Sequence, residues 1–182
     1  MKATKPWFVM EGRGDRTLAQ QMQGLDLLLE SVNGKTVLDV GCAEGLIDFE
    51  LIKAGAVAVH GVENRPQAVK DANALRGRLA CTFEQGDANT WHPKRSYNVL
   101  LLLAILHKLR EPDAACLRFI KYASDMVVIR LPPNHLNPCV LDGRSGGKLF
   151  MLSDHLSRAG FGIKRVEHGY LGEWIGYYTR RL

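Results

Sequence analysis

Short apolar stretches alternate with amphipathic stretches along most of the chain. The apolar stretches are rich in Val, Leu and Ile and hold few charges, as expected of strands buried on both faces of a sheet. We expect such strands at residues 36–40, 56–62, 79–84, 97–103 and 126–131. Between them apolar residues recur at helical spacing, which predicts helices at residues 45–54, 66–76, 112–122 and 148–159, the last one ended by Gly160.

The two ends of the chain depart from this alternation. Near the N-terminus, Asp15 is a suitable N-cap for a helix that reaches Val32, because Leu residues recur at helical spacing between them. Residues 132–147 are rich in turn-forming residues and predict a long loop. Residues 161–167 and 174–180 then predict a closing hairpin, with no helix between its strands.

Alternating strands and helices determine the expected fold class. Right-handed crossovers place such strands parallel in one sheet, so we predict a doubly wound α/β fold with helices on both faces. The closing hairpin predicts an antiparallel edge. We expect residues 1–34 to form an N-terminal extension with a helix, and residues 35–182 to form a single core domain.

Composition fits this fold and narrows the function only a little. The chain has 182 residues, of which 46% are hydrophobic and 24% charged, as is usual for one globular domain. The longest apolar run, Val99–Leu106, is far shorter than the roughly 20 residues that span a bilayer. The N-terminus lacks the apolar segment of a signal peptide, so we expect a cytoplasmic protein with no membrane partner. The scattered Cys and His residues predict no metal site.

A glycine-bracketed turn follows the first expected strand and is the most informative segment of the chain. It contains Gly41 and Gly45, which suit a sharp turn and a close approach to a ligand. Ala43 and Leu46 stand where the dinucleotide fingerprint requires glycines, and the Lys-Ser/Thr ending of a phosphate-binding loop is missing. Glu44 would repel a phosphate at the start of the next helix. These features favour a nucleoside without phosphates.

Acidic residues stand at the ends of the second and third expected strands. Glu63 follows Gly41 by about 20 residues, the spacing expected of an acid that binds both ribose hydroxyls. Asp87 and Ala88 follow the third strand, where a carboxylate can accept a hydrogen bond from an adenine amino group.

Four motifs in this order resemble those of class I S-adenosylmethionine (SAM)-dependent methyltransferases. The segment Asp39–Gly45 is similar to the first motif, Glu63 to the ribose-binding acid, and Asp87 with Ala88 to the adenine-contacting motif. Residues 98–107 resemble the fourth-strand motif, with Asn98 where Asp is commoner. The resemblance implies a seven-stranded, mostly parallel sheet with an antiparallel last strand, and SAM as the cofactor. It implies cofactor contacts from Asp39, Gly41, Cys42, Ala43, Gly45, Glu63, Asn64, Asp87, Ala88, Leu103 and Ala104.

The methyl acceptor is less well defined by the sequence. Ala104–His107 replaces the Asp-Pro-Pro-Tyr type of motif of enzymes that methylate amino groups, and Cys139 lies too late for a cytosine-methylating nucleophile. His107 is a candidate general base because its usual pKa is near neutrality. Candidates for substrate binding are Arg13, Arg130, Asn134 and His135.

We therefore predict a methyltransferase that acts on a small molecule. The net charge of +5 leaves an RNA methyltransferase with a basic surface as an alternative. A SAM-binding module without catalytic activity is a second alternative.

Overall fold

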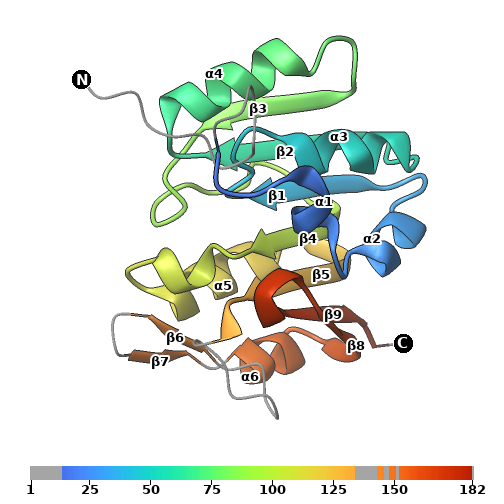
Figure 1. Ribbon diagram of the computed structural model, residues 1–182. Helices are drawn as coiled ribbons and strands as arrows, with labels where there is room; N and C mark the ends of the chain where they lie inside the picture. The colour runs from blue at the N-terminus through green and yellow to red at the C-terminus, as the bar shows by residue number, and fades with distance from the viewer. Residues whose placement is uncertain (1–13, 134–142, 146–147, 151, 182) are drawn as a thin grey trace.

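A computed structural model describes residues 14–133, 143–145, 148–150 and 152–181 of the chain. A seven-stranded sheet in the order β3-β2-β1-β4-β5-β9-β8 runs through the molecule (Figure 1). Its strands are β1 (Thr36–Val40), β2 (Ala58–Glu63), β3 (Cys81–Gln85), β4 (Tyr97–Leu103), β5 (Ala123–Leu131), β8 (Phe161–His168) and β9 (Trp174–Arg180). The predicted α/β sheet is confirmed, since β1 to β5 are parallel and β9 is antiparallel to both of its neighbours.

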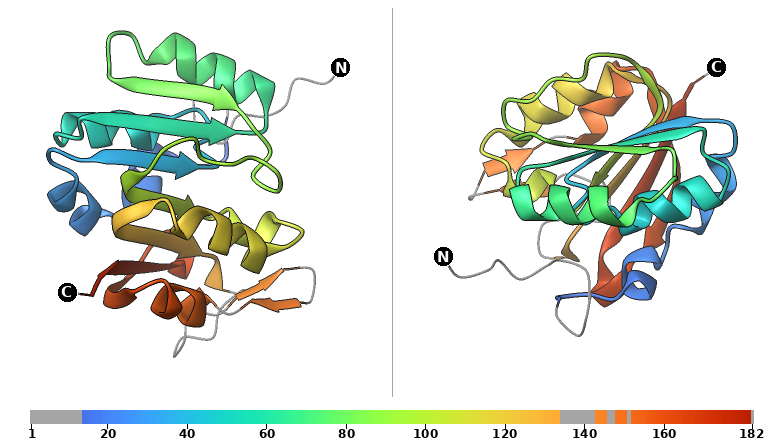
Figure 2. Two further views of the ribbon diagram at one scale, coloured as in Figure 1. Left: turned by 180° about the vertical axis from the view of Figure 1, so that it is seen from behind. Right: turned by 90° about the horizontal axis from the view of Figure 1, so that it is seen from above.

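Helices cover both faces of this sheet (Figure 2). On one face lie α1 (Leu18–Met22), α2 (Asp26–Ser31), α3 (Leu46–Lys53) and α4 (Pro66–Leu75), and on the other lie α5 (Pro112–Ile120) and α6 (Leu152–Arg158). Two short 3-10 turns are η1 (Leu106–Lys108) and η3 (Tyr170–Gly172). Each helical layer has its own apolar core, because the central strands project side chains to both faces. Among the described helices, none is long and apolar enough to cross a membrane.

The single N-terminal helix predicted from Asp15 to Val32 is wrong. Two short helices, α1 and α2, stand in its place, and Thr17 instead of Asp15 caps the first through a hydrogen bond from the backbone N of Gln20. Gly24 separates them with a positive φ of 78°, a conformation that continues no helix. A side chain there would lie 2.7 Å from the carbonyl oxygen of His168. The break therefore lets the chain cross closely over the end of β8.

The predictions for the C-terminal third need two corrections. The helix expected at residues 148–159 is shorter, because β7 (Lys148–Phe150) precedes α6. The loop expected at residues 132–147 contains β6 (Gly143–Ser145), which pairs with β7 in a separate two-stranded sheet. The closing hairpin is confirmed. However, β9, the strand that runs opposite to the rest of the sheet, is not at the edge but lies between β5 and β8.

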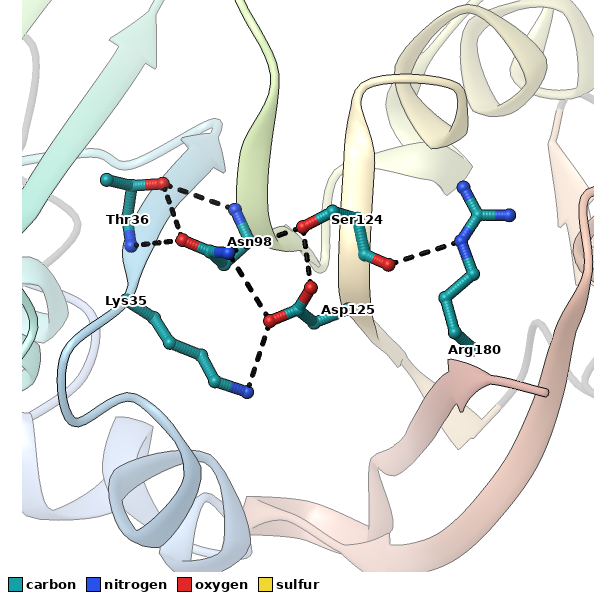
Figure 3. Close-up of polar contacts among 6 residues, drawn as sticks. All are labelled: Lys35, Thr36, Asn98, Ser124, Asp125 and Arg180. Carbon is teal, nitrogen blue, oxygen red and sulfur yellow. Dashed lines mark hydrogen bonds and ion pairs between the residues drawn. The ribbon is translucent and has the colours of Figure 1, made fainter. Parts of the chain in front are cut away.

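A polar cluster fastens the amino ends of the central strands (Figure 3). Asn98 on β4 accepts hydrogen bonds from the backbone N and Oγ1 of Thr36, each at 3.0 Å. Its amide Nδ2 donates to Ser124 Oγ and to Asp125 Oδ2 on β5, each at 3.3 Å. Lys35 completes the cluster with an ion pair to Asp125 at 3.5 Å. These contacts hold the amino ends of β1, β4 and β5 together. The carboxyl ends of the strands are the place where a ligand can bind.

Candidate functional site

A pocket of about 350 Å³ opens at the carboxyl ends of the parallel strands. It lies at the ends of β1 and β4, which are neighbours in the sheet. The strands after β1 are added on one side of this pair and the strand after β4 on the other. A ligand usually binds at such a reversal of strand order. Predicted cofactor residues that line it are Asp39, Gly41, Cys42, Ala43, Glu63, Asn64, Asp87, Ala88, Leu103 and Ala104. Thus one cavity brings together residues from all four sequence motifs.

The turn between β1 and α3 forms the floor of this pocket. Gly41, Ala43 and Gly45 all have positive φ angles, of 86°, 52° and 74°. A side chain at Gly41 would come within 3.1–3.3 Å of Ile105, so glycine keeps the space between the turn and Ile105 open. Gly45 is outside the lining and serves as the N-cap of α3, where a side chain would lie 2.5 Å from the Phe83 ring. Glycine at this position lets α3 begin in close contact with Phe83.

Glu63 holds the glycine turn against the end of β2. It is 7% exposed, and its Oε2 accepts a hydrogen bond from the backbone N of Ala43 at 3.1 Å. Its Oε1 accepts from the backbone N and the Nε of Arg65, at 3.0 and 3.2 Å. Arg65 also reaches Glu44 at 3.3 Å. These bonds fix the carboxylate at the pocket wall. Oε1 already accepts two hydrogen bonds, whereas Oε2 accepts one and keeps a second lone pair for a ligand.

Asp87 lies after β3 on the exposed rim of the pocket. Its Oδ1 accepts hydrogen bonds from the backbone N and Nδ2 of Asn89, at 2.9 and 2.7 Å. These bonds lower the pKa of Asp87, so the group stays a carboxylate and an acceptor at neutral pH. Ala88 beside it is buried and joins the core under α5.

Two buried carboxyl groups meet below the glycine turn. Asp39 on β1 is 3% exposed, and Asp48 in the first turn of α3 is fully buried. Burial raises the pKa of Asp39 to about 7, and Glu63 adds to the increase, while Asp48 and Arg130 oppose it. Burial also raises the pKa of Asp48 well above its usual range, with the charge of Asp39 adding to the effect. The sequence motifs identified Asp39 but missed Asp48.

Arg130 occupies a different place from the one predicted for a substrate-binding residue. It is 1% exposed and lies outside the pocket lining. Its guanidinium donates to Oε1 and the carbonyl oxygen of Gln21 on α1, at 2.8 and 2.6 Å, and lies 3.7 Å from Glu173. Glu173 also pairs with Arg16 at 2.7 Å. We therefore assign Arg130 to holding α1 beside the pocket, and not to contact with an acceptor.

The remaining predicted residues are less well placed. His107 is half-buried on η1 and is not part of the pocket lining, while the adjacent Lys108 is. Burial lowers the pKa of Lys108, with Glu63 opposing and Arg65 and Arg16 adding to the decrease. Arg13, Asn134 and His135 lie outside the described residues.

Several lining residues were not among the predicted cofactor or substrate contacts. They are Gln21, Ile47, Val62, Arg65, Gly86, Asn89, Ile105, Lys108 and Leu109. Most are immediate neighbours of a motif, so a wider window around each strand end would have found them. Gln21 is the exception, since it reaches the pocket only because α1 folds back over the sheet.

Comparison with known proteins agrees with this geometry. A family model described as a methyltransferase domain matches residues 31–133, more than half of the chain. The chain belongs to the methyltransferase domain family. The predicted class I methyltransferase fold, with SAM as the cofactor of that class, is thereby confirmed.

A curated relative matches part of this methyltransferase domain. The ribosomal protein L11 methyltransferase of Laribacter hongkongensis is 34% identical over 79 residues, which are 42% of this chain and 26% of that protein. The chain thus matches about a quarter of that relative's length.

Two solved structures share the fold with this methyltransferase domain. One is the magnesium protoporphyrin IX methyltransferase from Synechocystis PCC 6803 with bound SAH, with a TM-score of 0.69, 19% identity, and coverage of 90% of this chain and 84% of that one. The other is the cyclase SpnF, with a TM-score of 0.67, 17% identity, and coverage of 99% and 88%.

Proposed function

We propose that this protein transfers the methyl group of SAM to a small-molecule acceptor. The observation that carries the proposal is the single pocket in which the glycine turn, Glu63 and Asp87 converge. The transferred group is already activated as a sulfonium methyl when SAM is bound. The protein then needs to supply orientation, exclusion of water and, for some acceptors, a base.

The residues of the pocket fit a nucleoside that bears an amino acid. Gly41 leaves room that a Cβ atom would take against Ile105, and Glu63 presents a fixed, acceptor-only oxygen, Oε2, suited to a ribose hydroxyl. Asp87 offers a second carboxylate after the neighbouring strand β3. Asp39 has a buried oxygen, Oδ1, without a hydrogen-bond partner among the described residues. We assign Glu63 to the ribose, Asp87 to the adenine and Asp39 to the methionyl end.

Charge around the pocket mouth favours a small acceptor over RNA. A groove for nucleic acid carries an excess of Lys and Arg that neutralises phosphates. Here Arg65 pairs with Glu63 and Glu44, and Arg16 pairs with Glu173, so the basic groups near Lys108 are matched by acidic ones. Among the described residues at the pocket mouth, this balance lacks the cationic character expected of a phosphate-binding track.

An enzyme assay distinguishes the candidates. We expect purified protein to convert SAM to S-adenosylhomocysteine (SAH) in the presence of a pooled small-molecule fraction, and not with RNA or ribosomal protein. Turnover with RNA that falls steeply with salt would support the RNA alternative instead. SAM binding without turnover on any acceptor class would favour the binding module, a use of the fold other than methyl transfer.

A further inference from the structure

The carboxyl groups of Asp39 and Asp48 form a buried pair that the proposed cofactor contacts do not explain. Asp39 lines the pocket from β1, and Asp48, fully buried in the first turn of α3, lies outside the lining. Neither oxygen of Asp48, nor Oδ1 of Asp39, makes a hydrogen bond of ordinary length and angle among the described residues. The two groups nevertheless lie close enough for each to change the pKa of the other.

Two such groups cannot both be charged in this position. A carboxylate buried without donors loses its hydration, and a second adjacent negative charge adds Coulomb repulsion. One proton between them converts the repulsion into a carboxyl–carboxylate hydrogen bond, as in other close carboxyl pairs. The pair therefore carries either no charge or one negative charge near neutral pH.

The surroundings of the pair favour retention of that proton. Glu63 on β2 adds negative charge, whereas Arg130 on β5 adds positive charge that Glu173 partly neutralises. The thiols of Cys42 and Cys81 are the other titratable groups beside the pair, and burial raises the pKa of both, so they stay neutral. These neighbours leave the Asp pair as the group that gains or loses a proton around pH 7.

We propose that Asp48 is a positioning residue that shares one proton with Asp39, so that the pair becomes singly charged when the cationic methionyl end of SAM binds. This inference rests on the proposed function. In the pair without ligand at lower pH, both carboxyl groups are protonated. Binding of the cation releases one of these protons to solvent and leaves the other between the two oxygens. Asp48 contributes by keeping its proton and donating it to Asp39.

The first test uses the unmodified protein and isothermal titration calorimetry with SAM at pH 6, 7 and 8. A ligand that binds only the ionised form of a group with a pKa of about 7 binds roughly tenfold more tightly at pH 8 than at pH 6. We expect this change in Kd, together with release of up to one proton near pH 6. Titration in buffers of different ionisation enthalpy measures that release. The amino group of SAM would instead take up a proton on binding, which has the opposite sign.

Two variants show whether Asp48 is responsible. Asp48→Asn keeps a hydrogen-bond donor for Asp39, so we expect it to retain the SAM affinity and the pH profile of the unmodified protein. Asp48→Leu removes the donor, so we expect SAM binding at pH 7 to weaken by at least tenfold. Asp71→Asn on α4, outside the pocket lining, is the matched control and should retain the pH profile of the unmodified protein. Thermal melting checks that each variant is folded.

The outcomes separate this inference from the proposed function. Tight SAM binding that does not change with pH and exchanges no proton would overturn the inference and leave the proposed function standing. Wild-type SAM binding at pH 7 by folded Asp48→Leu would also overturn it, because Asp39 would then need no donor at position 48. Failure of the unmodified protein to bind SAM at every pH would refute the proposed function itself. If neither variant folds, the proton release measured with the unmodified protein tests the inference. Release of no proton at pH 6 would overturn it.

Discussion

The backbone N of Ala43 donates a hydrogen bond to Oε2 of Glu63 at 3.1 Å, which ties the glycine turn after β1 to the end of β2. The same carboxylate accepts two bonds from Arg65, so it is fixed before any ligand arrives. A group that is already held in place loses little conformational entropy when a ligand binds. This relationship makes Glu63 both a contact for the proposed ribose and a support for the turn that lines the pocket.

We expect Glu63→Ala to weaken SAM binding by about 1–3 kcal/mol, because charge-assisted hydrogen bonds to the ribose are lost. The loss should also reduce order in the turn, since the backbone N of Ala43 would lose its acceptor. Calorimetric titration with SAM measures the effect. Glu50→Gln removes a half-buried carboxylate that pairs with Lys53 outside the pocket lining, and should leave affinity unchanged. Unaltered binding by Glu63→Ala would show that the ribose lies elsewhere.

Ala43 has a φ of 52°, in a region where a Cβ atom costs about 1–2 kcal/mol. Glycine avoids this cost but loses more entropy on folding, by up to about 1 kcal/mol. We therefore expect Ala43→Gly to raise the free energy of unfolding by up to about 1 kcal/mol, with SAM affinity unchanged. Urea denaturation measures the difference.

Ala68→Gly is the matched control, because residue 68 lies inside α4 and has ordinary helical geometry. That substitution should lower stability by about 1 kcal/mol. Equal destabilisation by both glycines would contradict the strain that we assign to Ala43.

The convergence of the candidate cofactor residues on one pocket was predictable, because these residues stand at strand ends. Gly41, Glu63 and Asp87 each follow a buried apolar stretch, and the carboxyl ends of parallel strands share one edge of a sheet. The positions of these residues therefore follow from local sequence and the order of elements. The structure adds the contacts that hold them in place, such as the bonds between Arg65 and Glu63.

Features that depend on contacts between distant segments were not predictable. Arg130 meets Gln21 across most of the chain, so nothing near residue 130 indicates that the side chain is internal. The break at Gly24 depends on its close approach to His168 and on the hydrogen bond from Tyr177 Oη to its carbonyl oxygen, at 2.6 Å. Helical spacing continues through this glycine, and tertiary contacts overrode it.

Removal of the Arg130 side chain tests its structural role. We expect Arg130→Met to lower the free energy of unfolding by about 3–5 kcal/mol, because Glu173 would become a buried charge with one partner fewer. SAM binding should weaken as well, since Gln21 lines the pocket and would lose its anchor. Denaturation and calorimetry measure the two effects.

Arg158→Met, at an exposed ion pair on α6, should change stability little. A stable Arg130→Met protein with normal SAM affinity and a raised KM for the acceptor would restore the substrate-binding role that the sequence predicted.

The hydrogen bonds of Asn98 explain why this chain has Asn at a position of the fourth-strand motif where Asp is commoner. Its Nδ2 donates to Asp125, which a carboxylate cannot do, while its Oδ1 accepts from Thr36. We expect Asn98→Asp to lower the free energy of unfolding by about 1–2 kcal/mol at pH 8, from the lost bonds and the repulsion between two carboxylates. Repulsion raises the pKa of the new carboxyl group, so this loss should shrink as pH falls and the group is protonated.

The double variant Asn98→Asp, Asp125→Asn exchanges the acceptor and the donor across the same contact. It should recover part of the lost stability, as chemical denaturation at pH 8 would show. Additive losses in the double variant would mean that the contact between these two side chains contributes nothing.

The role of His107 as a general base stays a prediction, and its placement makes the test specific. His107 is half-buried beside the pocket, whereas Lys108 lines it. If His107 removes a proton from the acceptor, His107→Ala should slow turnover by roughly 10²–10⁴-fold while SAM affinity is unchanged. His92→Ala, at an exposed position outside the lining, is the control. Normal turnover by His107→Ala, with slow turnover by Lys108→Met, would move the acceptor contact to Lys108, whose pKa burial already lowers.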